Sequence, residues 1–142
     1  MRWTSSDRCR DAGLLIVRLG FGLGFLYFHG YSKLMHGPAA WARTGDAMAH
    51  FGITFGYQWW GLAAALAESV GGLLFAAGLF FRFACFALAG DMLVATIEQY
   101  SRPMSAPEHA AKNIFLFLGM FLTGPGRYSL DHLFWGRRDA GK

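Results

Sequence analysis

Apolar residues gather in four long stretches of this chain, and charged residues lie mostly at the ends of these stretches. The stretches cover residues 12–34, 59–81, 83–100 and 110–123. A helix of about 20 residues crosses the roughly 30 Å of hydrocarbon in a bilayer, so the first three stretches reach or approach the length of a membrane span. The fourth is shorter, and polar side chains at its start can extend it by reaching to the interface. The pattern predicts an all-α protein, an antiparallel bundle of four transmembrane helices that forms one domain over residues 1–142.

The segments between the stretches carry turn and interface signals. Residues 39–51 predict a short interfacial helix between the first two spans, with Trp41, Met48 and Phe51 facing lipid. A very tight turn at residues 81–82 separates the second and third spans, which forces these two helices into an antiparallel hairpin. Two prolines in the third connection predict a loop there.

Glycines within the spans predict where helices pack. Lipid gives helices little hydrophobic reason to associate, so small residues must let their backbones approach. Gly20, Gly22 and Gly24 lie in the first span, where Gly20 and Gly24 form a small-xxx-small pattern on one face, and Gly71, Gly72 and Gly78 lie in the second. We expect these positions to be helix contacts.

The composition favours a membrane protein and argues against other classes. The chain is 54% hydrophobic and 15% charged, whereas soluble domains carry about 25% charged residues. Its net charge is +4, but the basic residues lie at the ends of apolar runs rather than along one face, so nucleic acid is not an expected partner. The two cysteines, Cys9 and Cys85, form no CxxC pair, and the sequence has no metal-binding motif.

The distribution of Lys and Arg predicts the orientation of the bundle. Eight of them lie on the side of the termini and four on the opposite side, when Arg18 within the first span is set aside. Because cytoplasmic loops are richer in Lys and Arg, both termini should face the cytoplasm. The first apolar run, residues 13–34, is too long for the apolar region of a signal peptide, so we interpret it as a retained span. We therefore expect a multi-pass protein whose first partner is the lipid bilayer.

Ionisable residues inside the spans need a reason, because each costs about 2.5–3.5 kcal/mol at the bilayer centre. In the predicted topology, a group of them drawn from all four spans falls in the outer half of the bundle. His29 and Lys33 lie four residues apart on the first span and can point the same way. We predict a polar pocket that opens outward. Its expected members are His29, Lys33, Glu68, Asp91, Glu98 and Lys112, with Asn113 beside the last.

Each of these residues also has a simpler interpretation, and the sequence leaves both open. The two lysines can extend to lipid headgroups, His29 can bond a backbone carbonyl, and Glu98 can be an ordinary rim residue near water. Glu68 and Asp91 can form structural hydrogen bonds between helices while protonated. Arg18 has two open roles as well: it can pair with Asp11 or Asp131 at the inner surface, or it can join the buried polar network.

The order of several motifs resembles one known family. The motifs are LLIVRLGFGLGFLYFHGYSKL in the first span, LAESVGGLLFAAGLFFRFA in the second, GDMLVA in the third and GPGRYSLDHLF after the fourth. Together they resemble the DoxX family of small four-span membrane proteins, which implies a place in a bacterial inner membrane. Lys33 and Glu68 match family positions. The resemblance also implies structural roles for Gly71, Gly72, Arg82, Arg127 and Asp131.

The resemblance implies a link to quinone or sulfur redox chemistry. In a first hypothesis, a quinone enters between the helices, and Glu68, together with Lys33 or His29, exchanges protons with its oxygens. The ligand would be held by Asp91, Glu98, Lys112 and Asn113. The chain has no flavin, haem or cysteine-pair motif, so we expect no intrinsic cofactor and a redox partner protein that supplies the electrons.

A second hypothesis is not enzymatic. An outward polar pocket and the basic tail WGRRDAGK suit a small transporter, or a membrane scaffold that binds other proteins, equally well. The sequence leaves open which hypothesis holds and whether the chain forms a homo-oligomer.

Overall fold

The computed structural model describes residues 5–102 and 107–136, and every element in this part of the chain is a helix. The prediction of an all-α protein is confirmed for these residues. The elements are α1 (Ser5–Gly24), the π-helix η1 (Phe25–Tyr31), α2 (Ser32–Met35), α3 (Gly37–Gly45), the 3₁₀-helix η2 (Asp46–Phe51), α4 (Tyr57–Ala77), α5 (Phe81–Tyr100), α6 (Glu108–Thr123) and α7 (Leu130–Phe134).

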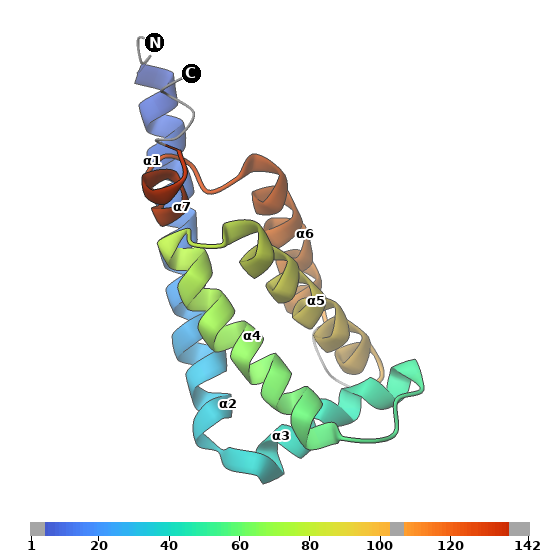
Figure 1. The fold of residues 1–142 in the computed structure, drawn as a ribbon. Helices are drawn as coiled ribbons and strands as arrows, with labels where there is room; N and C mark the ends of the chain where they lie inside the picture. Colours follow the sequence, from blue (N-terminus) through green and yellow to red (C-terminus); the bar gives the residue numbers. More distant parts are fainter. Residues whose placement is uncertain (1–4, 103–106, 137–142) are drawn as a thin grey trace.

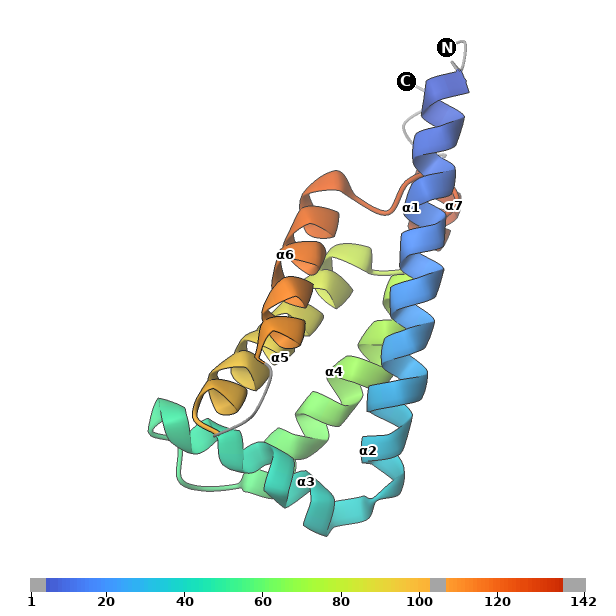
Figure 2. The same cartoon turned by 180° about the vertical axis from the view of Figure 1, so that it is seen from behind.

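The long helices run along one axis of the molecule (Figures 1 and 2). α1, η1 and α2 form one nearly continuous rod, and α4 packs along it. α5 returns beside α4, and α6 lies beside α5. The start of α1 and the short α7 lie at one end of the molecule, here named the terminal end, and α2 and α3 lie at the other, here named the α3 end (Figure 1).

Two helical segments, Ser6–Met35 and Tyr57–Ala77, are long and apolar enough to cross a membrane by length and composition. They correspond to the first two predicted spans. α6 has 16 residues, fewer than the 20 or so that cross the hydrocarbon without help from flanking residues. α5 has 20 residues, and its apolar character is lowered by charged side chains along its length.

The turn between α4 and α5 lies at residues 78–80, so its predicted position at residues 81–82 is wrong. α4 ends earlier because Gly78 takes the left-handed conformation, with φ of +66°. Arg82 consequently lies in the first turn of α5. Its side chain is exposed, and its guanidinium carbon lies 5.7 Å from the centroid of the Phe121 ring.

The segment between α2 and α4 folds over the α3 end as α3 followed by η2. α3 crosses α4 so closely that a Cβ atom on Gly61 would clash with the carbonyl of Trp41. The indole Nε1 of Trp41 donates a hydrogen bond of 2.9 Å to the carbonyl of Lys33. Met48 is half-buried, whereas Phe51 is exposed. The predicted lipid-facing set is therefore wrong for Trp41 and Met48, because close packing on α4 turns this segment's side chains toward the bundle.

α1 and η1 are in backbone contact with α4. A Cβ atom on Gly22 would lie 2.6 Å from the carbonyl oxygen of Gly72, and one on Gly72 would lie 2.8 Å from the carbonyl oxygen of Gly22. Further along the same face, Gly30 presses against the backbone of Ser69. Since no larger residue fits at these crossings, the glycines fix the register of the rod on α4.

The predicted contact at Gly20 and Gly24 is wrong. No heavy atom lies within 4 Å of a Cβ atom built at either position, whereas the predicted contact at Gly22, between them, is confirmed. A Cβ atom on Gly71 would make an ordinary contact of 3.6 Å with Leu88 of α5. The spacing of small residues identifies a helix face, but a neighbouring helix decides which face is covered.

Phenylalanine side chains fill the bundle toward the terminal end. The rings of Phe75 and Phe81 stack with centroids 5.1 Å apart. The ring of Phe117 meets Phe75 edge-on at 5.3 Å and Phe25 at 5.2 Å. All four side chains are buried, so α4, α5, α6 and η1 share one aromatic core.

Arg18 is buried in this half of the molecule, with 1% of its surface exposed. Its Nε donates to the carbonyl of Phe75 at 3.2 Å, and its Nη2 donates to that of Ala76 at 2.9 Å. Its Nη1 donates to the carbonyls of Pro125 and Tyr128 at 2.7 and 2.9 Å. The first two carbonyls belong to the last turn of α4, where helix carbonyls have no partner within the helix and the dipole is negative. Arg18 therefore clamps α1 to the end of α4 and to the segment before α7.

The hydrogen bonds of Arg18 go to backbone carbonyls, and Asp131, one of the two aspartates predicted to pair with it, lies within its electrostatic range. The clamp also explains the small residue at the end of α4. A Cβ atom on Gly78 would clash with the guanidinium of Arg18, in addition to straining the left-handed backbone.

Asp131 holds the same corner from the C-terminal side. Its Oδ1 accepts a hydrogen bond of 2.9 Å from the backbone N–H of Phe80, and its Oδ2 accepts one of 2.9 Å from that of Phe81. Its own backbone N–H donates to the carbonyl of Gly78 at 2.9 Å. A carboxylate at the start of α5 satisfies free N–H groups and complements the helix dipole. The geometry gives Asp131 a structural role.

We expect Arg18→Met to destabilise the protein strongly. The change removes the donors of four carbonyl hydrogen bonds, and each buried group left unsatisfied costs about 1–3 kcal/mol. Thermal loss of helicity, followed by circular dichroism in detergent, measures the effect. Arg82→Met is the matched control because it removes only an exposed contact with Phe121. Equal unfolding midpoints for the two variants would contradict the clamp.

We expect Gly22→Leu to destabilise the protein far more than Gly20→Leu. A side chain at Gly22 must push the rod away from Gly72, whereas a side chain at Gly20 meets open space. Overpacking of this kind costs about 1–3 kcal/mol or more. The same thermal measurement compares the two variants. A larger loss of stability in Gly20→Leu would disprove the contact between Gly22 and Gly72.

Candidate functional site

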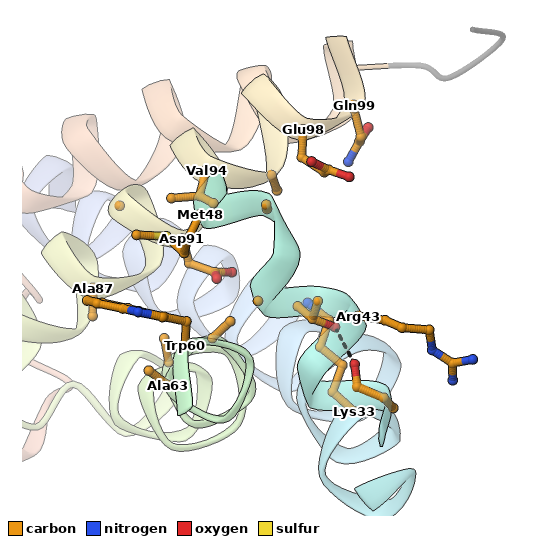
Figure 3. A pocket seen from close by; sticks show the side chains of 18 of the residues that line it. Lys33, Arg43, Met48, Trp60, Ala63, Ala87, Asp91, Val94, Glu98 and Gln99 are labelled. Atoms are coloured by element: carbon orange, nitrogen blue, oxygen red, sulfur yellow. Dashed lines mark hydrogen bonds between the residues drawn. The ribbon is translucent and has the colours of Figure 1, made fainter. Parts of the chain in front are cut away.

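A cavity of about 820 Å³ lies between α4 and α5 at the α3 end. Figure 3 shows Trp60 and Ala63 of α4 on one wall and Asp91 and Val94 of α5 on another. Met48 of η2 and residues of α2 and α3 complete the lining. Ligand sites in proteins typically have volumes of about 300–1,000 Å³, so this cavity is large enough for a small organic molecule.

Small side chains create the cavity. Phenylalanines fill the bundle near the terminal end, but the facing surfaces of α4, α5, α3 and η2 carry residues too small to meet across the same space. These lining residues are Ala40, Gly45, Ala47, Ala63, Ala64, Ala67, Ala87, Gly90 and Ala95. The walls are therefore mainly apolar, and only a few polar groups face the interior.

An ion pair joins the first and second long helical segments beside the cavity. The Nζ of Lys33 lies 2.7 Å from Oε1 of Glu68. The Glu68 side chain is only 2% exposed, whereas that of Lys33 is 32% exposed and lines the cavity. Gly30 and Ser69 touch one turn away and set this register, which brings the lysine opposite the carboxylate.

A second carboxylate completes a group of three charges. Asp91 lines the cavity and lies within electrostatic range of both Glu68 and Lys33. Among the residues that the structure describes, Oε2 of Glu68 and Oδ2 of Asp91 are buried and accept a hydrogen bond from no N–H or O–H group, but the two carboxyl side chains lie within hydrogen-bond reach of each other when one is protonated. Buried polar atoms are nearly always satisfied. One lysine cannot neutralise two carboxylates, so the group has room for one proton or for a donor from a ligand.

A second set of charges lies at the mouth of the cavity, where η2 meets the end of α5. Glu98 accepts a hydrogen bond from Nε of Arg102 at 2.7 Å, and its Oε2 lies 2.7 Å from Nε2 of His50. The His50 contact joins η2 to α5. Glu98 is thus a rim residue with partners of its own, and Arg43 of α3 also lines the rim with an exposed side chain (Figure 3).

Three residues predicted to belong to the pocket lie elsewhere. His29 is exposed, and its ring packs against Phe25 at 5.2 Å between centroids. Lys112 is exposed and lies 3.6 Å from Glu108 on the outer surface of α6. Asn113 is half-buried but does not line the cavity. The structure thus brings together the predicted residues of α2, α4 and α5 and leaves out those of η1 and α6.

His29 is left out because its neighbour Gly30 is the residue pressed onto α4. The face of the rod that meets α4 therefore passes through Gly30 and Lys33, three residues apart, rather than through His29 and Lys33. The segment around His29 is also a π-helix, a rare form that is common at functional sites.

Sequence reasoning missed His50, Trp60 and the alanines of the walls. His50 lies outside every predicted span, so the predicted topology assigned it no depth in the membrane and gave no reason to place it beside Glu98. The alanines carried a usable signal. Ala63, Ala64 and Ala67 mark one small-residue face of α4 at helical spacing, but such faces usually indicate tight packing and here enclose a cavity.

Arg127 lies at the terminal end, exposed, where it lines a smaller pocket of about 290 Å³ with Arg8, Asp11 and Tyr128. Neither pocket resembles a metal site. Within residues 5–102 and 107–136, no group of three or more His, Cys, Asp and Glu side chains is placed to hold a metal ion.

The profile of the DoxX family matches residues 13–100, more than half of the chain. The chain belongs to the DoxX family. The search of curated proteins and the search of solved structures gave no match. The matched part of this DoxX protein includes Lys33, Glu68, Asp91 and Glu98, whereas Arg102 of the cavity rim lies just beyond it. α6 and α7 lie beyond it.

We expect Lys33→Met to destabilise the protein by about 3 kcal/mol. Removing one partner of a buried ion pair costs about 3–5 kcal/mol, and the lower value applies here because Lys33 is partly exposed. The loss arises from the uncompensated charge left on Glu68. The double variant Lys33→Met/Glu68→Gln should recover most of the stability, because its glutamine is neutral.

Lys112→Met is the matched control for this experiment, since Lys112 belongs to an exposed pair that contributes little. Thermal unfolding in detergent compares all of these variants. A double variant no more stable than Lys33→Met alone would rule out the ion pair as the cause.

Proposed function

We propose that this DoxX protein crosses a bacterial inner membrane four times, through the α1–η1–α2 rod, α4, α5 and α6, with both termini in the cytoplasm. Asp91 and Glu98, which lower the apolar character of α5, are directed to the cavity and its rim. Large apolar side chains occupy the outer surfaces of α5 and α6, as lipid contact requires. These exposed residues are Phe83, Phe86, Leu93, Phe115, Leu118 and Leu122. The excess of basic residues on the side of the termini supports the orientation.

We infer that the cavity binds a quinone in a redox-linked membrane complex. The observation that carries this inference is the pair of buried carboxyl groups beside Lys33: Oε2 of Glu68 and Oδ2 of Asp91 accept from no N–H or O–H group, and the two side chains are close enough to share one proton. Apolar walls suit the ring of a quinone, and its two oxygens need a cation and proton donors. Lys33 and the protonated form of either carboxyl group supply them.

The proposed role in the reaction is proton transfer. Reduction of a quinone to a quinol adds two electrons and two protons. The electrons come from a redox partner protein, because the described residues offer no metal site and the sequence has no cofactor motif. The carboxyl pair of Glu68 and Asp91 holds one proton and passes it to a quinone oxygen. The pair then takes up the second proton from water at the mouth of the cavity and passes it on, while Lys33 stabilises the carboxylates that remain. His29 has no part in this proposal, since it is exposed outside the cavity.

One observation favours the non-enzymatic alternative. The rim of the cavity carries Arg43, Glu98 and Arg102, charged groups suited to a water-soluble solute or an exported protein. A small transporter or a scaffold protein would use this rim, whereas proton exchange with a quinone would use the group around Glu68.

Purification in mild detergent, followed by extraction and chromatography of bound quinone, tests the proposal. We expect the wild-type protein to retain quinone and Glu68→Gln to retain about tenfold less, the factor that loss of one charge-assisted contact would give. Glu108→Gln is the matched control, because Glu108 is exposed on α6 and does not line the cavity. Unchanged quinone content in Glu68→Gln contradicts the proposed proton exchange. An empty wild-type cavity, with partner proteins recovered by crosslinking, supports the scaffold alternative.

A further inference from the structure

We propose that the ligand reaches the cavity sideways from the hydrocarbon, through an opening between α4 and α5, and that its apolar tail stays in the bilayer. The lateral opening is defined by Ala63, Phe86 and Gly90. The ligand is thus a membrane-resident amphiphile with a compact polar head and a long apolar tail. The identity of that head as a quinone rests on the proposed function.

The opening follows from the exposure of three lining residues. Ala63 of α4 and both Phe86 and Gly90 of α5 line the cavity and are also exposed. Phe86 has 70% of its surface exposed. A residue that borders the cavity and the surroundings at once marks an edge of the cavity, so the cavity continues to the surface at these positions.

The depth of the opening decides what it faces. Gly90 lies at the midpoint of α5, a helix of 20 residues, and Phe86 lies one turn nearer the terminal end. Ala63 lies almost two turns inside the start of α4. If α4 and α5 cross the membrane, these positions lie within the hydrocarbon and not at its surface. Lipid chains, rather than water, then meet the opening.

The polar groups stand just inside the lateral opening. Asp91 follows Gly90 directly in sequence, and Lys33 and Glu68 are within its electrostatic range. A headgroup that passes Gly90 therefore meets Asp91 first and the ion pair next. The remaining lining near the opening is Ala64, Ala67 and Ala87, which offers an apolar tail no polar contact.

The rim at the α3 end is a poor route for such a tail. Glu98 is held there between His50 and Arg102, and Arg43 is exposed beside them. Drawing an apolar chain past these charges would desolvate them without compensation. The cavity thus has a charged mouth, which can admit water and protons, and an apolar side opening, which can hold a tail.

The test compares two leucine variants. A Cβ atom on Gly90 or on Gly119 would have no heavy atom within 4 Å, so both Gly90→Leu and Gly119→Leu should fold. Gly90→Leu places a branched side chain in the lateral opening, whereas Gly119→Leu places the same side chain on the exposed surface of α6. The probes are decylubiquinone, which carries an apolar tail, and ubiquinone-0, which has the same head and no tail.

We expect Gly90→Leu to weaken binding of decylubiquinone by about tenfold, a change equivalent to about 1.4 kcal/mol, and to change binding of ubiquinone-0 by less than about twofold. Gly119→Leu should change neither. Equal weakening of both probes in Gly90→Leu would show that the leucine disturbs the head site, and unchanged binding of both would show that the tail does not pass Gly90. Either result overturns the lateral route and leaves the quinone site intact.

A second measurement keeps the inference testable if the wild-type protein binds neither probe, a result that rejects the quinone proposal. A spin label is attached to Gly90→Cys in a Cys9→Ser background, where Cys85 is buried and unreactive. In lipid vesicles, the label should collide with oxygen, which concentrates in hydrocarbon, far more often than with a water-soluble nickel chelate. Preferential collision with the nickel chelate would place the opening in water and overturn the inference on its own.

Discussion

Direct backbone contact between the α1–η1–α2 rod and α4 sets the geometry of the rest of the structure. Gly22 and Gly72 meet without any intervening side chain, so the two helices cannot slide without a clash. Each end of this contact carries a buried charge. Arg18 clamps the end of α4 on one side, and the ion pair of Lys33 with Glu68 closes the other. One helix register therefore determines both the main structural clamp and the charged group of the cavity.

The two halves of the bundle are packed in opposite ways along the same helices. Near the terminal end, Phe75, Phe81 and Phe117 fill the space between helices with ring contacts. Near the α3 end, alanines such as Ala63 and Ala87 face each other across the cavity. Unfilled space forfeits dispersion contacts, so a cavity of this size weakens the fold locally. The aromatic half and the backbone clamp compensate by holding the α4–α5 hairpin from its other end.

The buried charges differ in how completely they are satisfied, and this difference separates structure from chemistry. Arg18 donates to four backbone carbonyls, and it has little capacity left for a ligand. Glu68 and Asp91 each retain a buried oxygen that accepts from no N–H or O–H group. A fully satisfied buried charge holds elements together. An incompletely satisfied one is a place where a proton or ligand can bind at little cost to the fold.

The sequence by itself determined the helical segments and the common depth of Lys33, Glu68 and Asp91, because depth depends only on the constant rise along each helix. It could not determine rotation about the helix axis. Only the tertiary structure decided that Gly30, and not His29, faces α4, and that the alanine faces enclose a space. The sequence could not identify the carbonyl partners of Arg18 either, since two of them, Pro125 and Tyr128, lie more than 100 residues away along the chain. Position along a helix is a property of one segment, whereas the face that becomes buried depends on two segments and on the side chains that keep them apart.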